Sequence, residues 1–396
     1  MNRREILKLL AVNTGLLIVG PRIASSETIV KEKKGKILFP SGSGKKGLSG
    51  SRYPNYFHVF DLDTLAYKTF EVPQALTHDC VPLAHDKDHV LVLEKDGPNA
   101  CVLNIVTGEI AGKFQASKGC VLSGHGLVDP EKSHFITSEF GYHQDVNKLV
   151  IRDLKNPNKI VGEIADMGVR PHEMVFFGGP RNIAVGHYGY ISYDKKANIE
   201  GEIRLVNLDS GKTIKNYTSG NWYSPCHIKK IDEKSFLAAS HSMVLKNIEQ
   251  RGIAGKEMYD YESRKVSLSP LRFFNVIESP MVYFHEDRGV QEVYPETAKT
   301  KWTVGMALDI ERKQMVSTST FSQHLSLWNT STGQSEGLID LPGKPSGVYQ
   351  TLDKSEWIVI DHKSKLYGVD VETFKIKWKR SLENPKIGVT PHIHIV

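Results

Sequence analysis

Side chains of the types that bind metal ions recur at one position of an internal repeat. Three copies of the repeat read HGLVDPEKSHFITSE from His125, HEMVFFGGPRNIAVGH from His172 and HIKKIDEKSFLAASH from His227. Imidazole, thiol and thioether groups are among the ligands that transition metals accept from proteins. The first position of each copy is therefore where we expect metal chemistry.

The same register extends to other segments of the chain. A further copy, CVPLAHDKDHVLVLE, begins at Cys80, and weaker copies begin at Met306 and Val348. The C-terminal VTPHIHIV echoes VRPHEMV, which places His392 at the position of His172. Histidine (16), methionine (8) and cysteine (4) make up 28 of the 396 residues, yet they fill six of these seven positions. We call this set the inner positions: Cys80, His125, His172, His227, Met306, Val348 and His392.

A second marked position ends the next strand of each repeat. That strand runs back antiparallel to the first, so we expect its last residue to lie on the same side of the molecule as the inner positions. We call these candidates for cofactor binding the outer positions: Glu94, Glu139, His187, His241 and His362.

The repeat length indicates a β-propeller. Successive inner positions from Cys80 to Val348 are 42 to 79 residues apart, and a period of about 40 to 50 residues is typical of blades with four antiparallel strands. Segments such as KLVIRDL at 148–154 and HLSLWNTSTG at 324–333 alternate apolar and polar residues and contain Asp or Asn near their ends. This pattern predicts strands joined by tight turns.

We therefore predict an all-β fold, a seven-bladed β-propeller of the WD40/YVTN-like type. The segments 36–42 and 56–72 supply only three strands of the first blade, so we expect a tail strand at 391–396 to complete it and close the ring. The long interval before Met306 predicts an insertion at about 243–280. Equivalent inner strands line the channel of a propeller, which would gather the inner positions into a ring at its mouth.

The ligand types are compatible with several metals. Imidazole suits zinc, copper, iron and nickel, a thiol and a thioether favour copper, and carboxylates such as Glu139 favour iron or manganese. One ion cannot contact seven strands, so only a subset of the inner positions, or a metal cluster, could be involved. We expect copper or iron, with zinc third. The competing interpretation is structural, because a repeated histidine can also tie one blade to the next by hydrogen bonds.

The N-terminus predicts an export signal. The paired Arg3 and Arg4 precede a modest apolar run and then small residues, which resembles a twin-arginine leader, the signal of a route for folded proteins. We expect 1–26 to be a signal peptide and 27–396 to form a single propeller domain in the periplasm.

Charge and composition exclude other classes of protein. The formal net charge is +6, and it falls to +3 without residues 1–26 because these carry four basic residues and one acidic residue. This charge is too weak to predict nucleic-acid binding. No other segment is apolar enough to predict a transmembrane span in the mature chain. No CxxCH motif occurs, so covalent haem is not expected.

Four cysteines are too few for a disulfide framework. Cys80 occupies an inner position, and Cys120 and Cys226 lie close to His125 and His227 in the sequence. A disulfide between neighbouring inner strands and thiolate ligation of a metal are equally compatible with this spacing.

Several segments resemble a known family. The runs CVLSGHGLVDPEKSHFITSEF (120–140), VRPHEMVFF (169–177), PCHIKKIDEKSFLAAS (225–240) and VSTSTFSQHLSLWNTSTG (316–333) resemble the bacterial propeller family catalogued as domain of unknown function 1513. The resemblance covers most of 36–396. It implies a place beside imelysin-type iron-uptake components of the bacterial envelope and a fold related to quinoprotein amine dehydrogenase propellers. It implies no particular reaction, because the chemistry of the family is not established.

The chain departs from the family pattern at three places. PCHI stands where the family has RHL, and VGHYGYI at 185–191 replaces a glycine-rich stretch. THDC stands where the family usually has another GHG, which leaves the second blade's ligand open between His78 and Cys80.

Two functions are compatible with these features. The first is a periplasmic protein that binds copper or iron, with redox activity or a link to iron uptake. The second is a non-catalytic propeller scaffold that docks a partner from an envelope metal-transport system. A lactonase-like hydrolase is a weaker option, because calcium takes oxygen ligands and the inner positions are rich in imidazole. The sequence leaves open whether the protein is an enzyme and assigns no catalytic residue.

Overall fold

Strands account for most of the repeat region in the computed structural model. The residues that it describes are 33–41, 55–74, 77–83, 86–129, 131–141, 146–189, 201–218, 224–241, 281–287, 289–293, 300, 302–382 and 392–396. All of them belong to one compact unit, Lys33–Val396. The predicted signal peptide at 1–26 and the predicted insertion at 243–280 lie outside the described residues.

The described residues contain strands and no helix, and every strand pair is antiparallel, which confirms the all-β prediction. Consequently no helix in this part of the chain is long and apolar enough to cross a membrane. The first sheet contains, in spatial order, β28 (His394–Ile395), β1 (Lys36–Ser41), β2 (Asn55–Asp61) and β3 (Tyr67–Val72).

An eight-stranded sheet comes next and has two four-stranded halves. Lys95 pairs with Ser123 and Gly97 pairs with Leu122, and these two pairings join the halves. The first half contains β4 (Thr77–Leu83), β5 (Asp86–Gly97), β6 (Asn99–Asn104) and β7 (Ile110–Gln115). The second half contains β8 (Cys120–Asp129), β9 (His134–Gly141), β10 (Asn147–Asp153) and β11 (Ile160–Ile164).

Four separate four-stranded sheets complete the described chain. The first two contain β12 (Pro171–Phe176), β13 (Asn182–His187), β14 (Glu202–Asn207) and β15 (Thr213–Thr218), then β16 (Ser224–Lys230), β17 (Ser235–His241), β18 (Met281–His285) and β19 (Gly289–Val293). The last two contain β20 (Thr303–Asp309), β21 (Gln314–Ser319), β22 (His324–Asn329) and β23 (Gln334–Asp340), then β24 (Pro345–Gln350), β25 (Glu356–Asp361), β26 (Lys365–Asp370) and β27 (Ile376–Ser381).

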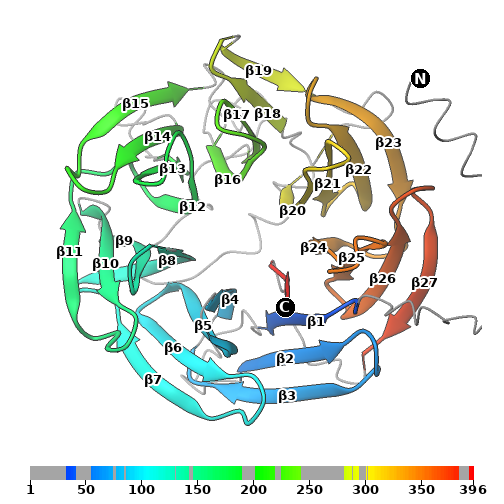
Figure 1. Ribbon diagram of the computed structural model, residues 1–396, viewed down its shortest axis with the longest axis horizontal. Helices are drawn as coiled ribbons and strands as arrows, with labels where there is room; N and C mark the ends of the chain where they lie inside the picture. Colours follow the sequence, from blue (N-terminus) through cyan, green and yellow to red (C-terminus); the bar gives the residue numbers. More distant parts are fainter. Residues whose placement is uncertain are drawn as a thin grey trace, which may run out of the picture. The chain divides into compact units, whose positions relative to one another are not determined.

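The sheets follow one another around a ring, with the first strand of each sheet or half-sheet nearest the middle (Figure 1). Apolar side chains fill the space between neighbours. The cluster between β1 and β4, for example, contains Leu38, Phe57, Val90 and Val92. Another cluster packs Ile37 and other residues of the first sheet against the last sheet. The hydrophobic core is therefore divided into layers between successive sheets.

Side-chain caps hold the outer turns. Asp61 accepts hydrogen bonds from the backbone N–H groups of Asp63 and Thr64, and Asn104 accepts them from Val106 and Thr107. Equivalent caps are formed by Asp153, Asn207, Asn329 and Asp370. An Asp or Asn that bonds to the backbone two or three residues further on favours a tight turn. The turns predicted from the strand ends have this physical basis.

Each of the six inner strands from β4 to β24 has an irregular pairing at its N-terminal part. The register shifts between Thr77 and Asp79 in β4, and between Leu122 and Gly126 in β8. Corresponding shifts occur in β12, β16, β20 and β24. A bulge re-aims the side chains of a strand, and these bulges coincide with the repeated inner positions or their direct neighbours.

The C-terminal strand pairs with the first strand of the chain. In β28, His394 lies opposite Leu38 and Ile395 lies opposite Ile37. The backbone N–H and C=O groups of Val396 also bond to Lys36. The tail therefore reaches the inner edge of the first sheet and carries His392 to the middle of the ring.

Candidate metal centre

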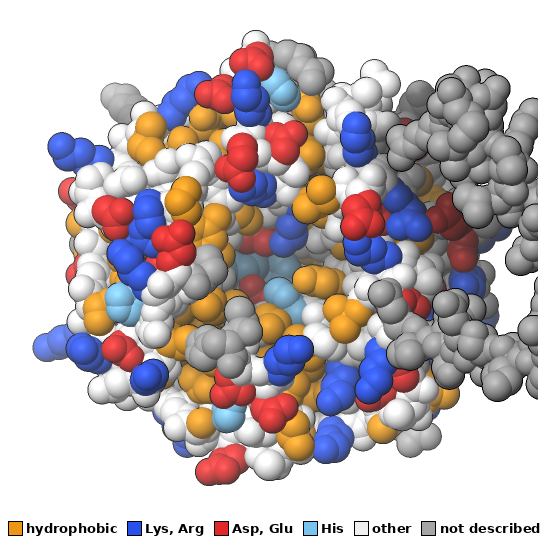
Figure 2. Space-filling model, in the orientation of Figure 1, with side chains coloured by type: hydrophobic (Ala, Val, Ile, Leu, Met, Phe, Trp, Pro, Cys, Tyr) orange, Lys and Arg blue, Asp and Glu red, His pale blue; other side chains and the backbone are white. Residues whose placement is uncertain are grey.

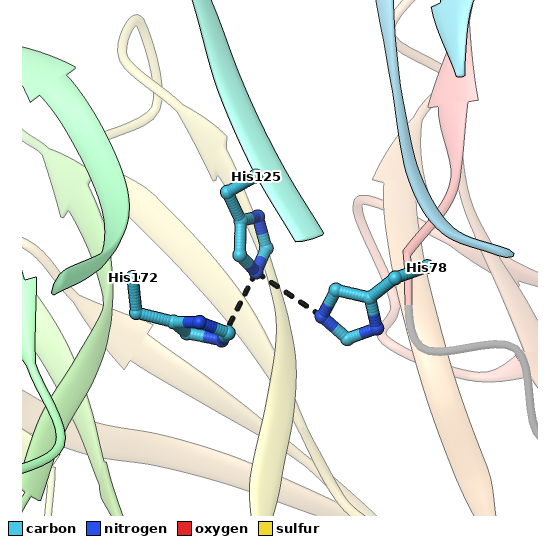
Figure 3. Close-up of side chains that lie close together, drawn as sticks. All are labelled: His78, His125 and His172. Atoms are coloured by element: carbon cyan, nitrogen blue, oxygen red, sulfur yellow. Dashed lines mark hydrogen bonds between the residues drawn. The ribbon is translucent and has the colours of Figure 1, made fainter. Parts of the chain in front are cut away.

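Three buried imidazoles from three successive inner strands meet in the middle of the ring. Nε2 of His125, on β8, lies 3.2 Å from Nε2 of His78, on β4. It also lies 3.1 Å from Nε2 of His172, on β12. Figure 3 shows the His125 ring between the other two, with the Nε2 atoms converging.

Two more imidazoles adjoin these three. The ring centroids of His227 and His392 lie 5.4 and 4.6 Å from that of His125, and 4.9 Å from each other. Metal-ligating atoms lie within 4.8 Å of one another in two groups, His78 with His125 and His172, and His125 with His227 and His392. We call the five residues the histidine cluster: His78, His125, His172, His227 and His392. Histidine surfaces lie in the hollow at the centre of the face in Figure 2.

A glycine allows β8 to approach its neighbour. Gly124 has a φ of +101°, and a Cβ atom there would lie 2.4 Å from the His78 ring. Only glycine adopts this backbone conformation readily, and only hydrogen fits this gap. The close approach of β8 to His78 therefore explains the first glycine of the Gly-His-Gly motif around His125.

Two carboxylates orient the histidine of the next inner strand. Asp79 Oδ2 accepts a hydrogen bond from Nδ1 of His125 at 3.0 Å, and its Oδ1 lies 2.9 Å from Nε2 of His394. Glu173 Oε2 lies 3.3 Å from Nδ1 of His227. Because each carboxylate contacts an Nδ1 atom, it leaves the Nε2 atom of the same ring available to a metal.

The carboxylates remain ionised. Burial raises the pKa of Asp79, but hydrogen bonds from His125 and His394 outweigh it and hold the pKa well below its ordinary value. Burial likewise raises the pKa of Glu173, and the Lys229 ammonium with the His227 ring brings it well below its ordinary value. The centre therefore contains two fixed negative charges directly behind the imidazoles.

Four imidazoles of the cluster are held neutral. Burial lowers the pKa of His227 to about 4, against the opposing effect of Glu173. Burial also holds the pKa values of His78, His172 and His392 well below 6.5, and their neighbouring basic groups act in the same direction. Neutral rings keep the lone pair that a metal requires.

A tyrosine and a lysine extend the contacts on one side. The Tyr188 hydroxyl lies 3.2 Å from Nε2 of His172, and Lys95 Nζ donates to the same hydroxyl at 3.2 Å. Arg170 stacks on the Tyr188 ring with its guanidinium carbon 5.0 Å from the centroid. Lys95 and Arg170 therefore contact Tyr188, which in turn contacts the cluster.

A cavity adjoins the other side of the cluster. Its volume is about 40 Å³. The residues that line it come from the tail, from the strands that carry the two carboxylates, and from β20 and β24, namely Asp79, Glu173, Lys229, Val304, Gly305, Met306, Gly347, Val348, Tyr349, His392, Ile393 and His394.

The inner positions divide into two groups in the structure. His125, His172, His227 and His392 lie in the cluster, whereas Met306 and Val348 line the cavity beside it. At the second repeat, where the sequence left two candidates, His78 lies in the cluster and Cys80 does not. Of the ligands predicted at the inner positions, Cys80 therefore lies outside the cluster, and Met306 borders the cavity beside it.

Cys80 lies in the apolar core between the first two sheets, where it packs with residues such as Leu38 and Val92. In a regular strand, residues i and i+2 share a face. The bulge at His78 breaks this relation, so that its ring turns to the centre while the thiol remains in the core.

All four cysteines are buried thiols and no disulfide joins them. Burial raises the pKa of Cys80 well above its ordinary value, that of Cys101 to about 11 and that of Cys226 to about 12. Both interpretations that the sequence left open, a disulfide and thiolate ligation, are therefore without support from the arrangement of the thiols.

The outer positions serve the sheets rather than the cluster. Glu139 pairs with the buried Arg152 at 2.7 Å, and Glu94 accepts hydrogen bonds from Asn99. Nδ1 of His187 contacts a backbone carbonyl, and burial lowers the pKa values of His187 to about 3 and His362 to about 4. None of these four joins either three-histidine group, and the side chain of His241 lies outside the described residues. Cofactor binding by the outer positions stays a prediction.

Sequence reasoning missed three residues that contact the cluster, Asp79, Glu173 and Tyr188, and also His394, which contacts Asp79. Asp79 and Glu173 each directly follow a cluster histidine, so the pairs His-Asp and His-Glu were a usable signal. His394 alternates with His392 on the tail, which was also visible. Nothing in the local sequence marked Tyr188, because its contact depends on the packing of β12 and β13.

Comparison with known proteins identifies the fold and a family match. Residues 71–210 match the model of a family described as protein of unknown function (DUF1513), which confirms the resemblance found in the sequence. The matched region includes His78, His125 and His172 with both orienting carboxylates. Among curated proteins no significant match is found.

Solved structures with the same fold are distant in sequence. The chain is similar to Kuenenia stuttgartiensis hydrazine synthase (TM-score 0.59, 10% identity, 88% of this chain and 99% of that chain). It is similar to the dihydro-heme d1 dehydrogenase NirN in complex with DHE (TM-score 0.53, 13% identity, 86% of this chain), of which it spans only 65%. It is also similar to BamB from Moraxella catarrhalis (TM-score 0.50, 10% identity, 83% of this chain and 80% of that chain). These likenesses confirm a β-propeller fold and carry no information on activity.

Proposed function

We propose that this chain is an exported, seven-bladed β-propeller that binds a transition-metal ion through the histidine cluster. In this proposal the two halves of the eight-stranded sheet count as two blades, and β28 completes the first blade. The observation that carries the metal site is the approach of the Nε2 atoms of His78 and His172 to that of His125, with ligand atoms of all three residues within 4.8 Å of one another.

The Nε2 separations have the size expected of ligands that share an ion. Metal–nitrogen bonds of about 2.0–2.1 Å place two nitrogens about 3.0 Å apart at a right angle and about 3.4 Å apart at the tetrahedral angle. The measured separations of 3.1 and 3.2 Å lie between these values. A histidine cluster shaped for coordination would have this spacing.

Hydrogen bonds between the rings explain the same contacts less well. A His125 ring whose one N–H group is at Nδ1 and faces Asp79 has one lone pair on Nε2, and two other Nε2 atoms approach it. Nε2 of His172 is also approached by the Tyr188 hydroxyl. One lone pair serves one good donor, whereas a metal ion accepts several nitrogen lone pairs at once.

The carboxylates behind the rings support the same conclusion. A metal-binding histidine usually donates its second N–H group to a carboxylate or carbonyl, which fixes the ring and makes it a better ligand. Asp79 occupies this place behind His125, and Glu173 occupies it behind His227. Two such carboxylate–histidine pairs in one cluster favour histidines that bind a metal over histidines that only link neighbouring blades by hydrogen bonds.

Copper or iron is the proposed metal, and zinc ranks third. The cluster offers only imidazole nitrogen, which suits all three. Both proposed metals change oxidation state, so a redox role is compatible with the site. The twin-arginine-like leader supports export to the periplasm, and the resemblance to an imelysin-associated family supports a link to iron uptake.

Metal analysis of the full chain tests this function. The exported protein is purified, loaded separately with copper, iron and zinc, dialysed, and analysed by mass spectrometry for bound metal. We expect close to one equivalent of copper or iron in the wild type and a marked loss in His125→Ala, His172→Ala and His227→Ala. His134→Ala, which changes a histidine of β9 outside the cluster, is the matched control.

A wild type that retains less than about a tenth of an equivalent of every metal after loading would overturn the proposal. The non-catalytic scaffold would then be the better interpretation.

A further inference from the structure

The cavity beside the histidine cluster has two different walls. One wall carries His392, His394 and the ion pair between Glu173 and Lys229, whose atoms lie 2.7 Å apart. The opposite wall, from β20 and β24, presents backbone and apolar side chains such as Met306 and Val348. The cluster takes its imidazoles from β4, β8, β12, β16 and the tail, whereas β20 and β24 contribute no imidazole to the cavity wall.

His392 belongs both to the cluster and to the cavity wall. It forms a three-histidine group with His125 and His227. Its Nε2 atom is shielded from solvent and has no hydrogen-bond partner within the described part of the chain. Shielded polar atoms in folded proteins nearly always have a partner, and this atom points to a ligand at the border of cluster and cavity.

The volume of the cavity limits what it can hold. A single water needs about 10–15 Å³ of such space, and the cavity measures about 40 Å³. It therefore accommodates a molecule of two or three non-hydrogen atoms. The Lys229 ammonium and the His394 ring on the wall supply hydrogen-bonding groups for such a molecule.

We propose that this cavity binds a small oxygen- or nitrogen-donor molecule that completes the coordination of a metal held on the His392 side of the histidine cluster, by His125, His227 and His392, the group that shares His125 with His78 and His172. The proposal rests on the metal-binding function proposed above and adds an open coordination position beside which a small molecule fits. Three protein ligands with a fourth position left open distinguish reactive metal sites from structural ones, which are closed by protein ligands.

Azide is the probe, because it has three atoms and produces a visible charge-transfer band when it binds copper(II) or iron(III). The wild type is loaded with whichever of these metals it retains, its metal content is measured, and azide is added while absorption is recorded. We expect a saturable new band. Val348→Phe, which fills the cavity from β24, should keep the metal and weaken azide binding by at least about tenfold, since overpacking leaves no room for the probe.

Val161→Phe on β11 is the matched control, because Val161 is exposed and distant in sequence from the cavity wall. It should bind azide like the wild type. If Val348→Phe does not fold, Met306→Phe tests the same space from β20.

The outcomes separate the two proposals. Bound metal without an azide band overturns the open position and leaves the metal site intact. An unchanged azide affinity in a metal-loaded, folded cavity-filling variant overturns the assignment of the ligand to this cavity. Absence of bound copper and iron from the wild type overturns this proposal, and absence of bound zinc as well overturns both.

Discussion

The Nε2 atoms of His125 and His172 lie 3.1 Å apart, although their strands β8 and β12 belong to different sheets. The two rings are nearly perpendicular, with an angle of 81° between their planes. A contact of this kind either ties two sheets by a hydrogen bond or marks two ligands of one ion. The alternatives differ in what metal removal does to the protein.

Metal removal should destabilise the wild type and leave His125→Ala unaffected. A ligand that binds only the folded state at 100 times its dissociation constant stabilises that state by about 2.7 kcal/mol. His125 belongs to both three-histidine groups, so its loss removes the effect. Thermal unfolding with and without a chelator measures this difference. Equal shifts in the wild type and the variant would rule out the cluster as the source.

Asp79→Asn should weaken metal binding by about 10- to 100-fold, the usual effect of removing a carboxylate behind a ligating histidine. The amide keeps the shape of Asp79 but loses the charge that accepts from His125 and His394. Competition titration with a chromophoric chelator gives the affinity. Asp86→Asn, in the same sheet and paired with His89 instead, is the control. The same affinity in both variants would contradict an orienting role for Asp79.

His78→Ala should change the metal content of the protein, whereas Cys80→Ala should change its stability. His78→Ala should lower the metal content, because its Nε2 atom faces the cluster. Cys80→Ala should leave the metal content unchanged and lower stability by about 1 kcal/mol or more, because it removes a buried group from the core between two sheets. Mass spectrometry and urea unfolding provide the two readouts. If Cys80→Ala lost its metal and His78→Ala kept it, the thiol of Cys80 and not the imidazole of His78 would be the ligand.

Ile395→Ala should destabilise the protein by about 2–5 kcal/mol, the usual cost of truncating a buried isoleucine. Ile395 is 6% exposed and packs with Ile37 and Ile358, so it secures the tail between the first and last sheets. Ile376→Ala, at an exposed position of β27, should change stability by only about 0.5 kcal/mol. Urea unfolding compares the two. Equal costs would mean that the tail does not stabilise the ring.

The metal-free protein should lose stability as the pH falls from 6.5 toward 4. In this window the unfolded chain protonates histidines at their ordinary pKa of 6.5, whereas burial keeps His227 neutral to about pH 4. A lowered folded-state pKa therefore gives stability that is present above pH 6.5 and decreases below it. Each such histidine contributes up to about 1.4 kcal/mol per pH unit.

Urea unfolding at pH 7, 6 and 5 measures how the free energy of unfolding changes with pH. His227→Asn should reduce this slope by the contribution of one histidine, up to about 1.4 kcal/mol per pH unit. A slope that is the same in the variant and the wild type would contradict the buried neutral state of His227.

Much of the fold was accessible from periodic patterns. Alternating segments and terminal Asp or Asn residues predicted third strands such as 148–154, and the structure has β10 there with Asp153 capping the turn. These features depend on contacts between residues close in sequence, so a single chain reveals them. The repeat also identified His125, His172 and His227, which lie at equivalent points of successive inner strands.

The composition of the centre depended on packing that no local pattern encodes. A bulge of one residue turns His78 inward and leaves Cys80 in the core, and the alternation of the sequence is the same in both arrangements. Asp79 reaches His125 from a different inner strand, and Tyr188 reaches His172 through the loop that follows β13. The repeated sequence thus specifies which strands line the channel, because strand formation and blade length are local properties. Which side chains meet there follows only from the bulges and from the contacts between sheets distant in sequence.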